Sequence, residues 1–122
     1  MRGDTALYGR PDIPAVVVSK LPGFERVHGE IMLTGVDAQG YHRRFDDLAI
    51  VGPAIGERSL AWGEVRRLTK TGPRGLKLEL KTGEILDDVR AGVQLKRVTL
   101  QSPDVYKTFD FDDVEAIEFL DN

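Results

Sequence analysis

The chain has 122 residues, 41% of them hydrophobic, which is enough for one ordinary domain or two very small packed ones. Its net charge of -3, with both signs interspersed, argues against a dedicated binder of nucleic acid or anionic membranes, and the absence of cysteine excludes disulfides, thiolate zinc sites and thiol nucleophiles. No apolar run reaches the roughly 18 residues of a membrane span and no signal peptide is recognisable, so we expect no membrane association and, by default, a cytoplasmic location.

The first third of the chain predicts a short leader, two strands and a hairpin loop. Residues 1–12 are rich in glycine, proline and charge, which is typical of a flexible leader. Residues 15–21 are apolar on both faces at their centre, as in a strand that is covered twice. Residues 26–33 predict a second strand, in which Gly29 marks a bulge or sharp bend. The polar segment 35–40 then predicts a hairpin loop.

Residues 41–52 predict a strand with a break in its middle. Aromatic and apolar side chains occupy odd-numbered positions up to Phe45 and even-numbered positions from Leu48 onward. Because the side chains of a strand alternate between two faces, this change requires an inserted residue. We expect a bulge or short bend at Asp46 and Asp47.

The second half repeats the order of the first. Residues 76–80 alternate cleanly between apolar and charged side chains, and further extended segments are expected over 85–89 and 93–103. The last of these changes parity at Lys96 and Arg97, fifty residues after the break in the first half. Two segments that share such a break indicate a repeated unit.

The end of each half shows the clearest similarity. Residues 108–119 match the apolar pattern of 59–70, and both segments predict a strand, one turn of 3₁₀ helix and a second strand. In the second copy we expect this turn at Val114 to Ile117, which are three positions apart. A helix over 111–120 is the rival interpretation, and the aromatic and β-branched residues of this segment disfavour it.

We therefore expect an all-β chain of two packed repeats, 13–71 and 74–122, joined at residues 71–75. The order of strands in each repeat, with a glycine turn after the first strand and a 3₁₀ turn before the last, resembles the Sm-like and SH3-like small β-barrels. The glycine turns lie in the segments LPGFE and LKTGE. The resemblance implies a barrel that assembles through exposed edge strands and, to a lesser degree, RNA binding. A single antiparallel β-sandwich is the alternative architecture.

The sequence predicts no catalytic, cofactor-binding or metal-binding residue. The serines stand in no nucleophile motif, and the three aspartate pairs lack the spacing of a calcium loop. His28 and Glu30 share one face of a strand, but two ligands are too few for a metal site. The segment GPRGLK at 72–77 lacks the spacing of a phosphate-binding loop, so we interpret it as the connection between the repeats. Trp62, the only tryptophan, is expected to pack in the core.

Three classes of function stay open. The first choice is a non-catalytic binding or assembly module with a protein partner or a second copy, because a unit of about fifty residues buries little area by itself. The second is nucleic-acid binding at a basic, partly aromatic patch, and the third is an accessory subunit of an enzyme. The candidate patch residues are Tyr41, His42, Arg43, Arg44, Arg66 and Arg67.

Some matching positions of the two repeats carry opposite charges. Asp46 and Asp47 in the first correspond to Lys96 and Arg97 in the second. Two similar surfaces that face each other would diverge in this way, and unselected drift of surface residues explains the pattern equally well.

Overall fold

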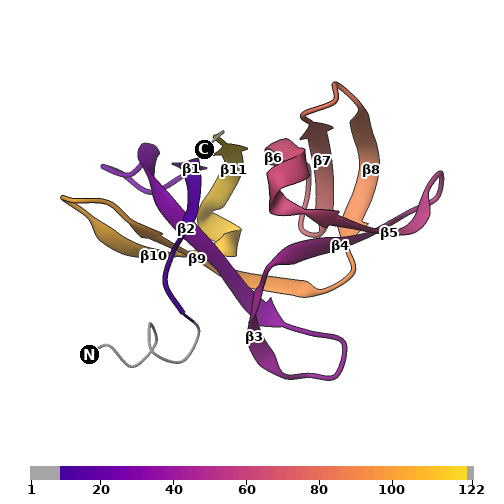
Figure 1. Ribbon diagram of the computed structural model, residues 1–122, viewed down its shortest axis with the longest axis horizontal. Coiled ribbons are helices and arrows are strands. Elements are labelled where there is room, and N and C mark those ends of the chain that lie inside the picture. The colour runs from indigo at the N-terminus through magenta and orange to yellow at the C-terminus, as the bar shows by residue number, and fades with distance from the viewer. Residues whose placement is uncertain (1–8, 121–122) are drawn as a thin grey trace.

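A computed structural model of the protein describes residues 9–120, which contain strands, two 3₁₀ turns and their connections (Figure 1). The strands are β1 (Ile13–Ser19), β2 (Arg26–Val36), β3 (His42–Phe45), β4 (Asp47–Gly52), β5 (Gly56–Ala61), β6 (Val65–Lys70), β7 (Gly75–Leu80), β8 (Ile85–Ala91), β9 (Gln94–Gln101), β10 (Tyr106–Asp110) and β11 (Val114–Phe119). The turns are η1 (Trp62–Glu64) and η2 (Phe111–Asp113). Over this described range, no helix is long and apolar enough to cross a membrane.

All eleven strands belong to one open antiparallel sheet, so the prediction of an all-β chain is confirmed. The strand order is β10-β9-β2-β1-β11-β6-β7-β8-β4-β5, and β3 lies beside β2. The pairing does not stay within the predicted units 13–71 and 74–122, because β2 pairs with β9 and β8 pairs with β4. The strands of the two halves therefore alternate in blocks along a single sheet.

Figure 1 shows two groups of strands side by side. We call the group β11, β1, β2, β9 and β10 the β1 lobe, and the group β6, β7, β8, β4 and β5 the β7 lobe. The pairing of β11 with β6 joins the lobes. Each lobe takes two strands from one half of the chain and three from the other.

Backbone hydrogen bonds of one lobe recur in the other. In the β1 lobe Leu120 N donates to Pro14 O at 2.9 Å, and in the β7 lobe Thr71 N donates to Gly75 O at 3.0 Å. Likewise Lys20 N donates to Asp113 O in the β1 lobe and Lys81 N donates to Glu64 O in the β7 lobe, both at 2.9 Å. The two lobes thus place residues of matching position in the same local geometry.

The predicted changes of parity are confirmed. The chain bends at the single residue between β3 and β4. In β9 the residue Lys96 is an unpaired bulge, because Thr34 pairs with Arg97 while the next residue, Gly35, pairs with Leu95. Each insertion keeps the apolar side chains on the buried face of the sheet.

Two local predictions need correction. The 3₁₀ turn of the second half exists but lies at residues 111–113, three positions earlier than Val114 to Ile117, which are strand; the rival helix is wrong. At Gly29, where we expect a bulge or a sharp bend, the β1–β2 register is unbroken, so the bulge is absent and the bend stays a prediction. A Cβ at Gly29 would lie 2.7 Å from the carbonyl oxygen of Gln101, so this glycine permits the close approach of β9.

The core is one cluster of apolar side chains that draws on both lobes. Trp62 is 4% exposed, which confirms its predicted place in the core. Its indole Nε1 donates to the carbonyl oxygen of Phe45 at 2.9 Å, and its ring stacks on Phe119 with centroids 5.3 Å apart. A buried indole N–H needs such a partner, so this contact fixes the turn η1 against the β3–β4 bend.

Candidate functional site

The hairpin part of the predicted basic patch is open to solvent. Tyr41 is 70% exposed just before β3, and His42 and Arg43 are exposed beside it. The Arg43 guanidinium lies 3.5 Å from the Asp37 carboxylate and 5.0 Å from the centroid of the Phe45 ring. This tip therefore offers an aromatic ring, an imidazole and a partly neutralised cation.

Arg44, the next residue, connects β3 to the segment before β1 and to the β3–β4 bend. Its side chain is only 17% exposed. Its guanidinium donates to the carbonyl oxygen of Arg10 at 2.7 Å and binds the Asp12 carboxylate. Its Nε lies 3.2 Å from Asp46 Oδ1 without the geometry of a hydrogen bond, so this contact is an ion pair. Two carboxylates thus neutralise Arg44, and residues 10–12 of the predicted flexible leader are tied to the sheet. Residues 1–8 lie outside the described part.

Arg66 and Arg67 lie on β6, and their contacts are separate from those of the hairpin. Arg66 donates to the carbonyl oxygen of Lys81 at 3.3 Å. Arg67 binds the Glu118 carboxylate, which also accepts two hydrogen bonds from Arg26, at 2.7 and 3.1 Å. The hydrogen bond and charge of Arg26, with the charge of Arg67, lower the pKa of Glu118. The six predicted patch residues therefore divide between two places, and their described partners do not connect them.

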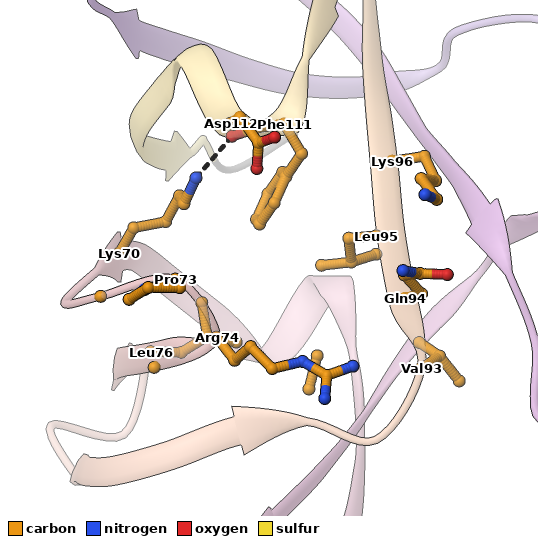
Figure 2. Close-up of a pocket in the computed structure, with 13 residues that line it drawn as sticks. Lys70, Pro73, Arg74, Leu76, Val93, Gln94, Leu95, Lys96, Phe111 and Asp112 are labelled. Carbon is orange, nitrogen blue, oxygen red and sulfur yellow. Dashed lines mark hydrogen bonds between the residues drawn. The ribbon is translucent and has the colours of Figure 1, made fainter.

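A hollow that the sequence did not indicate lies between the lobes (Figure 2). We call it the Lys70 hollow; its volume is about 190 Å³. Four stretches line it: the end of β6, the connection 72–75, the link from β8 to β9, and the turn η2. Leu95 turns its side chain toward Phe111, while Gln94 and Lys96 lie on the other side of β9 (Figure 2).

Lys70 spans the gap between the lobes at this hollow. Its Nζ donates to the carbonyl oxygen of Phe111 at 2.7 Å and lies 4.7 Å from the centroid of the Phe111 ring. Burial lowers the pKa of the Lys70 ammonium, and the charge of the nearby Asp112 acts in the opposite direction. Lys70 is thus partly desolvated and bound to a neutral carbonyl oxygen.

Arg74 adds positive charge to the same lining, and Lys96 belongs to it through β9 while its side chain lies on the other side of the strand (Figure 2). Within residues 9–120, no hydrogen bond or ion pair is found for either side chain. One carboxylate, that of Asp112, belongs to the lining. The sequence did not predict this site, because residues 72–77 were interpreted only as a connection between the repeats. The one signal in the sequence was that Lys70 occupies the position of the aromatic Phe119 in the other copy.

A second hollow occupies the matching place on the other side of the junction. We call it the Trp62 hollow; it is lined by the start of β1, the end of β11, the β3–β4 bend and η1. Here the ring of η1, Trp62, is covered by Phe119, and Arg44, which lines the hollow together with Lys81, is held by Asp12 and Asp46. The Trp62 hollow therefore satisfies its own aromatic and charged groups.

The sheet ends in two edge strands, β10 and β5. On β10, Ser102 N donates to Val105 O at 2.8 Å where the hairpin with β9 closes. Because hydrogen-bonded and non-hydrogen-bonded pairs alternate along an antiparallel ladder, the backbone groups of Thr108 and Asp110 point away from β9. The hydroxyls of Thr108 and its partner Thr99 lie 3.3 Å apart, as the closer spacing of a non-hydrogen-bonded pair allows.

The β5 edge is more protected than the β10 edge. Ala61 N, at the end of β5, donates to the Glu64 carboxylate at 2.9 Å. Glu57 and Arg58 place charges of both signs along the rest of the strand. Strand β10 also carries charges of both signs, at Lys107 and Asp110, but the N–H of Asp110, which matches Ala61, has no such side-chain acceptor within residues 9–120, so β10 is the more available edge.

Residues 9–120 hold no group of three or more histidine or acidic side chains that could bind a metal ion. Comparison of the chain with protein-family models, curated proteins and solved structures gives no match. The function is therefore inferred from the sheet, its edges and the two hollows.

Proposed function

We propose that this chain is a non-catalytic assembly module in which two Sm-like small barrels share one sheet, and that it associates with a second copy through the edge of β10. The strand order of the lobes supports the two barrels. In the β1 lobe β1 lies between β2 and β11, and in the β7 lobe β7 lies between β8 and β6. Both β11 and β6 follow a 3₁₀ turn, so the two lobes have the same arrangement. Each barrel takes its first two strands from one half of the chain and its last three from the other, so the halves exchange hairpins.

The matching registers of the two lobes support this exchange. Ile31 on β2 pairs with Leu100 on β9, and Ala91 on β8 pairs with Ile50 on β4. Ile50 and Leu100 occupy matching positions of the two halves, so each half receives the hairpin of the other at the same point. Neither half retains its own first hairpin, which makes the two barrels one folding unit.

The single observation that carries the assembly proposal is the edge of β10, where the backbone groups of Thr108 and Asp110 point outward and no other strand of residues 9–120 pairs with them. Two copies of β10 can pair antiparallel about a twofold axis at Thr108, whose backbone groups point outward. In that register Tyr106 faces Asp110, and Lys107 faces Phe109. No like charges are opposed, which favours the pairing.

The experiment is a light-scattering measurement of molar mass over a range of protein concentrations. The variant Thr108→Pro removes an outward N–H and leaves the bonds to β9 in place. Ser59→Pro is the matched control, since Ser59 occupies the position on β5 that Thr108 occupies on β10. We expect the wild type and Ser59→Pro to form dimers at high concentration and Thr108→Pro to stay monomeric. A monomeric wild type at every concentration, or a dimeric Thr108→Pro, contradicts self-association through β10.

A second candidate function is nucleic-acid binding at the β2–β3 hairpin. The exposure of Tyr41 beside His42 and Arg43 favours it, because bases stack on open aromatic rings and phosphates bind cations. Fluorescence anisotropy with a single-stranded RNA should then show affinity that falls steeply with salt and weakens in Tyr41→Ala. If the chain does not bind the RNA at low salt, nucleic-acid binding at this hairpin is contradicted.

A further inference from the structure

The Lys70 hollow holds more positive charge than its own side chains neutralise. The side chains of Lys70 and Arg74 line it together with the single carboxylate of Asp112, whereas Lys96 directs its side chain to the other side of β9 (Figure 2). Arg74 reaches along the lower wall of the hollow, and Lys70 points into its upper part (Figure 2). We infer that this hollow binds a small organic anion, a carboxylate or a phosphate ester carried on a compact apolar body.

The Trp62 hollow provides an internal comparison. The position of Asp46 in the Trp62 hollow corresponds to Lys96 in the Lys70 hollow. The position of Phe119 in the Trp62 hollow corresponds to Lys70 in the Lys70 hollow, so an amino group stands in place of a ring. Asp12 and Asp46 bind Arg44 on one side, whereas on the other side the neutral Gln94 matches Arg44 and the cations of the lining are Lys70 and Arg74. The aromatic ring that covers Trp62 is likewise replaced by a flexible cation. The Lys70 hollow thus lacks the apolar cover of its counterpart, and its lining has one carboxylate, that of Asp112, for the two cations Lys70 and Arg74.

The remaining walls are apolar and suit the body of such a ligand. Leu76, Leu95 and the ring of Phe111 line the hollow between the two cations. Its volume of about 190 Å³ is below the 300 to 1,000 Å³ usual for pockets that take drug-sized molecules. A single ring or short branched chain with one anionic group therefore matches the available space.

Lys70 also has bonding capacity left for an anion. An ammonium has three N–H donors, and one of them is used by the carbonyl oxygen of Phe111. Burial already disfavours the charged form of Lys70, as its lowered pKa indicates. A bound carboxylate or phosphate would stabilise that charge and raise the pKa of Lys70. Arg74 can add a bidentate contact to either anionic group.

The test is an amide chemical-shift titration of the full chain by NMR with four probes: benzoate, phenyl phosphate, inorganic phosphate and benzyl alcohol. We expect benzoate, phenyl phosphate or both to shift the amides of Gly72, Gly75, Gln94 and Asp112 and to saturate. A preference for benzoate assigns the site to carboxylates, and a preference for phenyl phosphate assigns it to phosphate esters. Equal binding of inorganic phosphate overturns the need for an apolar body, and equal binding of benzyl alcohol overturns the need for charge.

Arg74→Gln is the decisive variant because no described contact of Arg74 stabilises the fold. It should weaken binding about tenfold, the loss expected for one charge-assisted contact. Lys77→Gln is the matched control, since Lys77 is exposed on β7 and does not line the hollow. Unchanged affinity in Arg74→Gln, or equal loss in both variants, overturns the assignment. Both variants should retain the thermal midpoint of the wild type.

Discussion

Gly35→Ala tests the contact through which the two halves of the chain exchange strands. Gly35 lies on β2 opposite the bulge of β9. A Cβ added there would lie 2.0 Å from the carbonyl oxygen of Gln94 and 3.0 Å from the amide nitrogen of Lys96. These are backbone atoms, so the methyl group cannot be accommodated by turning a side chain. The β9 backbone has to move away from β2 at the bulge.

The expected loss of stability follows from that movement. Overpacking of this kind costs about 1 to 3 kcal/mol, and each ladder hydrogen bond lost with it contributes about 1 kcal/mol. We expect the free energy of unfolding to fall by about 2 to 4 kcal/mol, which for a chain of this length lowers the thermal midpoint by about 10 °C. Urea denaturation followed by circular dichroism measures the free energy of unfolding, and heating followed by the same signal measures the thermal midpoint.

Gly63→Ala is the control for this experiment. Gly63 lies in η1, and a Cβ there would meet no atom within 4 Å. The substitution should change stability by less than about 0.5 kcal/mol. If Gly35→Ala is as stable as Gly63→Ala, then β9 does not approach β2 as described, and the reasoning about the exchange is refuted.

Three further predictions concern single contacts. The pKa of Glu118 is lowered mainly by its hydrogen bond with Arg26. The stability that this carboxylate contributes is therefore present above the ordinary pKa of 4.5 and is lost as the pH falls through the lower pKa of the folded state. The urea midpoints of the wild type and of Glu118→Gln should differ at pH 7 and converge in acid. Trp62→Phe leaves the buried carbonyl oxygen of Phe45 without its donor and should cost about 1 to 3 kcal/mol in urea denaturation, and a cost near zero would show that the indole bond is not needed. Deletion of Lys96 removes the bulge and turns the preceding residues of β9 to the wrong face, so the protein should lose its cooperative thermal transition; a native-like transition contradicts the bulge.

The local structure was largely predictable because it depends on alternation within single segments. The change of parity between Phe45 and Leu48 requires an inserted residue in any sheet, and the same holds around Lys96. The turn before the last strand was misplaced by three residues because Val114 and Ile117 have the spacing of a 3₁₀ turn, whereas in the structure both are buried on a strand whose register with β1 shifts at Glu115. Alternation defines the faces of a strand, but it does not fix where a turn begins.

The pairing of strands was not predictable from the same pattern. Ile50 and Leu100 are both apolar and occupy matching positions, so Ile31 could have paired with either one. The choice depends on the geometry around Gly35 and the β9 bulge, which appears only once distant segments meet. The Lys70 hollow was not predictable for the same reason. Lys70 and Arg74 have no local sequence signal, and they form a site only because η2 and β9 lie beside them in the fold.

The most direct test of the exchanged hairpins is a nuclear Overhauser measurement between α protons. In antiparallel sheets the α protons of non-hydrogen-bonded pairs face each other, and the alternation along β9 places Ile31 with Leu100 in such a pair. The exchange predicts a strong signal between the α protons of Ile31 and Leu100. A signal between Ile31 and Ile50 instead would show that each half keeps its own hairpin, which contradicts the exchange.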